Sequence, residues 1–141
     1  MKKMNNKGFS LVELIVVVLI MAIIAVALAP QVMKWVENSR KSNDIENYNA
    51  LVEAANVAGT DENVVAALGT AATISFGSTG TSISNPTLQT AMLKTLPDAL
   101  TTKTQSDWTN STNRPPFTFT VQTTTDGIKI TKTKAPVKDF S

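Results

Sequence analysis

One apolar stretch dominates this sequence: it runs from Phe9 to Ala29 and contains a single charged side chain, Glu13. As a helix rising about 1.5 Å per residue, the stretch spans roughly 31 Å, close to the thickness of a bilayer hydrocarbon core. A carboxylate in such a helix costs on the order of 2.5 to 3.5 kcal/mol. We therefore expect one membrane-spanning helix and a functional partner for Glu13.

Three lysines, Lys2, Lys3 and Lys7, precede this stretch and are expected to stay cytoplasmic, which places the chain after Ala29 on the outside. They also account for the formal charge of +2. Of the 13 basic residues, ten remain after residues 1–8 are removed, against 11 acidic ones, so the net charge becomes −1. The basic balance therefore does not predict nucleic-acid binding.

The composition restricts the possible functions. A chain of 141 residues allows one small domain beside the apolar stretch. It contains no Cys and no His, which excludes thiolate nucleophiles, histidine proton shuttles, Cys/His zinc sites and disulfides. No pair of carboxylates marks a catalytic site either, so we expect no enzyme and no cofactor.

Two ordinary interpretations of the apolar stretch are unsatisfactory. A secretory signal peptide would match the small residues of Ala27-Leu28-Ala29, but the stretch is too long, contains Glu13, and would place Pro30 directly after the cut. A plain single-pass anchor fits the length but leaves Glu13 unexplained.

The string Gly8-Phe9-Ser10-Leu11-Val12-Glu13 resembles the processing signal of type IV pilins and pseudopilins. The resemblance implies that a prepilin peptidase cuts between Gly8 and Phe9 and methylates the new amino terminus of Phe9. It also implies that Glu13 attracts the amino terminus of a neighbouring subunit during assembly. Pairing of Glu13 with the amino terminus of its own chain is the alternative.

Pro30 lacks a backbone N–H, so the Val26 carbonyl loses its helical donor. We expect a kink or a locally extended stretch between these two residues. The resemblance implies that this proline takes part in assembly, and a simple kink at the membrane exit is the alternative.

The helix is expected to continue to about Asn56, with Gly59 as its C-terminal stop. Tyr48 and Trp35 are interpreted as core or subunit-contact residues. The apolar face is assigned to Trp35, Val36, Ile45, Tyr48, Val52 and Ala55, and the polar remainder to Glu37, Asn38, Arg40, Lys41, Asn43, Asp44 and Asn47.

The composition then becomes rich in Thr, which is typical of strands and loops. We expect a short helix over 61–68 closed by Gly69, a strand over 72–76, a flexible turn over 77–80, and a helix that Asn85 caps and that ends before Pro97. Alternation over 117–124 predicts a hairpin with a type I′ turn at Asp126-Gly127, pairing Thr125 with Ile128. This sheet would cover the apolar stripe of the long helix.

The predicted fold class is therefore α+β, a long N-terminal helix packed on a small antiparallel sheet, which the pilin resemblance also implies. We expect a cytoplasmic leader (1–8), a transmembrane and polymerisation helix (9–29), the amphipathic half of that helix (30–58) and a Thr-rich head (59–141).

Charged side chains near the C-terminus suggest no metal site. Asp126 and Asp139 are too few and too far apart for calcium. A cluster formed by Lys129, Lys132, Lys134 and Lys138 could bind DNA phosphates, but edge lysines that block strand pairing are the favoured interpretation. Family pilins often close their C-terminal loop with a disulfide; this chain has no Cys, so hydrogen bonds and packing must stabilise its head.

We expect a structural subunit that polymerises into a type IV pilus-like surface filament, for adhesion, motility or DNA uptake. A pseudopilin of a type II secretion-like or competence apparatus is the nearest alternative, and a membrane-tethered binding domain is another. The expected partners are copies of the same chain, the prepilin peptidase, the membrane and a pilus assembly platform. The precursor would be a single-pass protein of the cytoplasmic membrane with its head outside.

Overall fold

The computed structural model describes residues 8–69, 71–109 and 113–138. The leader predicted for residues 1–8 therefore lies outside the described residues except for Gly8. By its internal contacts the chain divides into two units, residues 1–36 and residues 37–141.

Helix α1 (Leu11–Ala58) is a single run of 48 residues. Of the two alternatives expected near Pro30, a kink or a locally extended stretch, the extended stretch is wrong because the helix continues through this residue. The flanking segment is rich in Ala and Leu, good helix formers, which offset the one backbone hydrogen bond that proline removes. Every side chain from Phe9 to Val36 is exposed.

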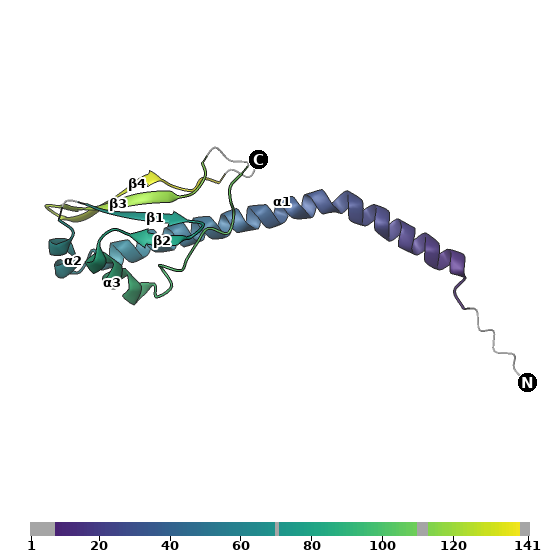
Figure 1. The fold of residues 1–141 in the computed structure, drawn as a ribbon, viewed down its shortest axis with the longest axis horizontal. Helices are drawn as coiled ribbons and strands as arrows, with labels where there is room; N and C mark the ends of the chain where they lie inside the picture. The colour runs from purple at the N-terminus through teal and green to yellow at the C-terminus, as the bar shows by residue number, and fades with distance from the viewer. Residues whose placement is uncertain (1–7, 70, 110–112, 139–141) are drawn as a thin grey trace, which may run out of the picture. The chain divides into compact units, whose positions relative to one another are not determined.

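The second unit has two layers (Figure 1): the C-terminal part of α1 lies along one face of a four-stranded antiparallel sheet. The strand order is β2-β1-β3-β4, so β2 and β4 form the edges. The elements are α2 (Glu62–Ala67), β1 (Ala72–Gly77), β2 (Gly80–Ile83), α3 (Pro86–Thr95), β3 (Phe117–Thr124) and β4 (Gly127–Lys134).

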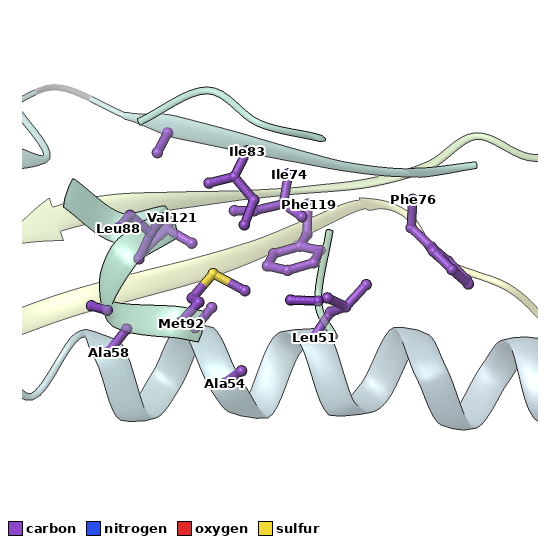
Figure 2. Packing of buried hydrophobic residues seen from close by; sticks show 14 of the residues in the cluster. Leu51, Ala54, Ala58, Ile74, Phe76, Ile83, Leu88, Met92, Phe119 and Val121 are labelled. Carbon is purple, nitrogen blue, oxygen red and sulfur yellow. The ribbon is translucent and has the colours of Figure 1, made fainter. Parts of the chain in front are cut away.

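The core lies between these layers (Figure 2). Leu51, Ala54 and Ala58 of α1 face the sheet, and small alanines allow the helix to approach it closely. From α3, Leu88 and Met92 extend the same cluster. The sheet contributes alternate residues, namely Ala72, Ile74 and Phe76 from β1 and Phe117, Phe119 and Val121 from β3. The predicted α+β fold, with the sheet covering the helix, is confirmed.

Two short helices begin close to the predicted positions, and α3 begins at the predicted cap. The carboxylate of Asp61 accepts from the backbone N–H of Asn63 (2.9 Å) at the start of α2. The amide oxygen of Asn85 accepts from two backbone N–H groups at the start of α3, and Pro86 occupies the first turn. Gly69, with φ of 59°, follows α2 in the left-handed conformation expected of a helix stop.

The hairpin of β3 and β4 forms, but its predicted register is wrong by two residues. Thr124 pairs with Gly127 and Thr123 with Ile128, so the turn is not the predicted Asp126-Gly127 pair. A type I′ turn needs positive φ at both central residues, and Asp126 does not adopt it. Because a shift of two residues preserves the face, Ile130 lies on the same face as in the predicted register, but its partner is Val121 rather than Thr123.

The turn predicted over 77–80 forms, and it is the tight connection of a second hairpin, in which Gly77 pairs with Gly80 and Ile74 with Ile83. The strand that follows this turn, β2, is not predicted by the sequence pattern. Gly80 has φ of 135°, and a Cβ there would lie 2.9 Å from the Leu100 carbonyl oxygen. The alternation in this short strand is Ser and Thr rather than apolar, so the pattern gave no signal.

Helix α1 ends at Ala58, directly before Gly59, close to the predicted position. Gly59 does not end the helix in the predicted manner, because its φ is not in the left-handed region of a helix stop. A Cβ at this position would lie 2.0 Å from Cδ1 of Ile128, so the glycine leaves room for a strand β4 side chain. Its role is close packing rather than helix termination.

Candidate functional site

Glu13 makes a reciprocal contact with Ser10 at the start of α1. The backbone N–H of Ser10 donates to Glu13 Oε2 (3.1 Å), and the backbone N–H of Glu13 donates to Ser10 Oγ (3.2 Å). This is a capping box, and its S-x-x-E signature is present in the sequence. A carboxylate has about four acceptor positions, so this contact leaves Glu13 able to accept from an ammonium group as well.

Gly8 and Phe9 lie immediately before the capped helix, outside regular secondary structure. Phe9 is 84 % exposed, and a Cβ added to Gly8 would meet no atom within 4 Å. The peptide bond between them is therefore accessible within the described part of the chain. Nothing in the fold around Gly8 requires glycine at this position.

The four lysines singled out above lie on or just after β4, an edge strand of the sheet. Lys129, Lys132, Lys134 and Lys138 are all exposed. Thr118 pairs with Lys134 whereas Phe119 pairs with Lys132, which leaves a bulge in β4. A bulge and exposed lysines both discourage pairing with a further strand.

A buried polar cluster is the part of the head that sequence reasoning missed. Lys41 and Asp44 were assigned to the polar, outward side of the helix, and that assignment is wrong: they are 3 % and 0 % exposed. The buried residues of α1 recur every three or four positions, at Lys41, Asp44, Tyr48, Leu51, Ala55 and Ala58. The helical spacing of these positions thus indicates that Lys41 and Asp44 are buried, whereas their polar side chains favour the opposite prediction, exposure to solvent.

Asp44 holds the long connection between α3 and β3. Its Oδ1 accepts from the backbone N–H of Gln105 (2.6 Å), and its Oδ2 accepts from the backbone N–H of Ser106 (3.0 Å). Oδ2 also accepts from Nε1 of Trp108 at 2.9 Å. Three N–H donors thus converge on one buried carboxylate, and their hydrogen bonds satisfy both of its oxygens away from water.

Further contacts complete this cluster. Ser106 Oγ donates to Glu37 Oε1 and accepts from the backbone N–H of Trp108 (3.0 Å). Trp108 has φ of 55°, in a region that bulky residues rarely adopt. The contacts of its backbone and ring with neighbouring residues hold it in this unfavourable conformation. Lys41 Nζ lies 5.6 Å from the Trp108 ring centroid, within range of a cation–π interaction. The segment from Gln105 to Trp108 is thus tied to α1 without a disulfide.

Aromatic rings connect this cluster to the sheet. Trp108 meets Phe117 edge to face at 5.1 Å between centroids, and Tyr48 meets Phe117 and Phe119 in the same manner at 6.4 and 5.6 Å. Tyr48 is a core residue, as predicted. Trp35, in contrast, is 77 % exposed and belongs to the other unit, so it is not part of this core.

Replacing Tyr48 with Phe is expected to leave the thermal unfolding midpoint unchanged or to raise it at neutral pH. The Tyr48 hydroxyl is buried and has no hydrogen-bond partner among the described residues. Removing an unpaired buried hydroxyl while retaining the ring removes a desolvation cost. Thermal unfolding of the full chain in detergent, monitored by circular dichroism, measures this; a midpoint lower by several degrees would contradict it.

The same tyrosine gives a pH dependence. Desolvation raises the pKa of Tyr48 above its ordinary value of 10.0. The unfolded chain therefore loses this proton first as the pH rises past 10.0, and stability falls from there until the folded-state pKa is passed. Tyr48→Phe is expected to lack this component of alkaline destabilisation. Tyr48 is the only tyrosine, so tyrosinate absorbance reports its titration directly.

An exposed apolar helix with a capped carboxylate near its start, followed by an α+β head, defines a pilin-like architecture and is consistent with a membrane-anchored precursor. By length and composition, α1 could cross a membrane, and none of its most apolar window is buried inside the structure.

Residues 3–29 match the family model of the prokaryotic N-terminal methylation motif. This motif is the hallmark of type IV pilins and pseudopilins, and the match supports a type IV pilin-like or pseudopilin protein. The motif implies processing by a prepilin peptidase, association with the membrane and pilus-type assembly. Comparison with curated proteins gave no match, and neither did comparison with solved structures.

Proposed function

We propose that this chain is a structural subunit of a type IV pilus-like surface filament, held together by its N-terminal helix. The observation that carries the proposal is the extent of the exposed apolar surface. From Leu11 to Val36 the helix is about 39 Å long, which exceeds the roughly 30 Å of a bilayer core. The last exposed apolar side chains of this stretch are Val32, Met33, Trp35 and Val36. Packing against other copies would cover what a membrane leaves exposed.

In this proposal the prepilin peptidase cuts between Gly8 and Phe9 and methylates the amine of Phe9. The accessible peptide bond supports this. The described fold leaves space for a side chain at Gly8. If processing requires glycine at this position, the requirement therefore comes from the peptidase that binds this segment.

Cleavage at this bond would create a positive charge at Phe9, and Glu13 would be its partner in the neighbouring subunit. Subunits staggered along a filament axis can bring the two groups together, and each offsets the other's cost of leaving water. An ion pair of this kind fixes the register between neighbouring subunits more than it adds to the stability of the filament. Pro30, within the exposed helix, is proposed to take part in the same packing.

The proposal includes no catalytic activity for this chain. Before assembly it would cross the cytoplasmic membrane once, with residues 1–8 inside and the head outside, and would be passed to an assembly platform. The filament would then lie on the cell surface.

Electron microscopy of material sheared from cells tests the proposal. Antibody to residues 60–141 should decorate long filaments in wild-type cells, and these filaments should be absent when the chain is deleted. Labelled subunits that remain in the membrane, with no filament, would contradict a pilus. If this chain forms only short fibres that protein secretion requires, the pseudopilin alternative is correct.

A further inference from the structure

Charges of opposite sign are segregated along the head. Residues 42–93 contain five acidic residues and no Lys or Arg. Between Asp126 and Asp139, in contrast, the chain contains four lysines and no acidic residue. Such segregation within one small head gives it one negative and one positive surface, provided that the side chains are exposed.

The exposed members define both surfaces. Of the five acidic residues, Asp44 is buried and Asp61 caps α2, which leaves Glu46, Glu53 and Glu62 exposed; we call these the acidic face. Glu46 and Glu53 are seven residues apart and therefore share one side of α1. The four exposed lysines of β4 and the residues after it, Lys129, Lys132, Lys134 and Lys138, form the basic edge.

Neither surface is neutralised inside the chain. Within the described residues, no side chain of the acidic face or of the basic edge has an ion-pair or hydrogen-bond partner. The buried side of α1 packs on the sheet, and β4, which carries Lys129, Lys132 and Lys134, is an edge strand of that sheet. The two surfaces are therefore different patches of one molecule, both available to a partner.

We propose that the basic edge of one head contacts the acidic face of the next copy of this chain. A contact between two different patches is heterologous, so it repeats without limit and is compatible with a helical filament. Electrostatic complementarity of this kind selects partner and register more than it supplies affinity. The inference rests on the proposed function and names the surfaces through which the heads would recognise each other.

DNA is a weaker candidate for the basic edge. Binding to phosphates would not involve the acidic face, and single-stranded nucleic acid is generally bound with the help of aromatic stacking. Among the described residues, the exposed aromatic side chains are Phe9 and Trp35, both of which precede the head. A second copy of the chain, in contrast, provides a surface of opposite charge.

Charge reversal in the full-length chain tests this inference. The variant Lys129→Glu/Lys132→Glu and the variant Glu46→Lys/Glu53→Lys should each lower the yield of sheared filaments at least about tenfold, since each places like charges together. The four substitutions combined should restore the yield to within about threefold of wild type, because attraction returns with its sign exchanged. Raising the salt concentration should weaken wild-type filaments and should reduce the defect of both reversals.

Lys94→Glu/Lys103→Glu is the matched control for the lysine reversal: it changes the net charge by the same amount, at exposed positions outside both surfaces. Its filament yield should equal that of wild type, and all variants should accumulate in the membrane to the same level. The inference is overturned if either reversal assembles normally, or if the combined variant is no better than the reversals. Normal filaments that no longer retain DNA would assign the basic edge to nucleic acid. If wild-type cells lack filaments, the proposed function itself fails.

Discussion

Replacing Asp44 with Ala is expected to destabilise the head by about 3 kcal/mol or more and to lower its unfolding midpoint by more than about 10 °C. Three N–H donors, from Gln105, Ser106 and Trp108, converge on this carboxylate. Without it the donors of Ser106 and Trp108 are left buried without an acceptor, and the Gln105 N–H also loses its partner. Thermal unfolding of the full chain in detergent, monitored by near-ultraviolet circular dichroism, measures the loss.

Glu46→Ala is the control for this experiment, because Glu46 is an exposed acidic residue on the same helix. It should change stability by no more than about 0.5 kcal/mol. Trp108→Phe removes only one of the three donors and is expected to cost less than Asp44→Ala, although it also removes packing volume. An Asp44→Ala midpoint within a few degrees of wild type would show that Asp44 does not hold this segment.

Replacing Glu13 with Ala is expected to reduce sheared filaments at least about tenfold while the subunits remain in the membrane as monomers. The substitution removes the carboxylate proposed to pair with the amino terminus of a neighbouring subunit. Immunoblots of sheared and membrane fractions compare the two populations. A normal filament yield would contradict the proposed role of Glu13.

Two further variants separate the charge of Glu13 from its capping contact. Glu13→Gln can still accept from the Ser10 N–H in a capping box but carries no charge. Ser10→Ala retains the charge and removes the hydroxyl that caps the helix. If charge pairing drives assembly, Glu13→Gln should fail and Ser10→Ala should assemble. The reverse result would assign Glu13 a role confined to its own helix.

Local sequence signals predicted the elements whose causes are local. Asp61 and Asn85 begin helices because their side chains accept from the next backbone N–H groups, and this requires no distant partner. The face of the β3–β4 hairpin was also predictable, since alternation fixes which side chains point the same way. Its register was not, because a shift of two residues satisfies the same alternation.

The candidate site divides in the same manner. Gly8, Phe9 and Glu13 belong to one short motif, and the capping partner Ser10 lies within it, at the S-x-x-E spacing of a capping box. Asp44 and Trp108 are 64 positions apart, and neither belongs to a motif. A polar residue on a helix is ordinarily assigned to the solvent side, and only a partner from a distant loop reverses that assignment.

By itself, the sequence determined the membrane-length helix, its carboxylate, the processing motif and the α+β composition of the head, because these depend on apolar length, spacing and caps. The tertiary structure alone decided the strand order, the burial of Asp44 and the separation of the two charged surfaces. Those features depend on contacts between residues far apart in the chain, and their free energy exists only when the head is folded.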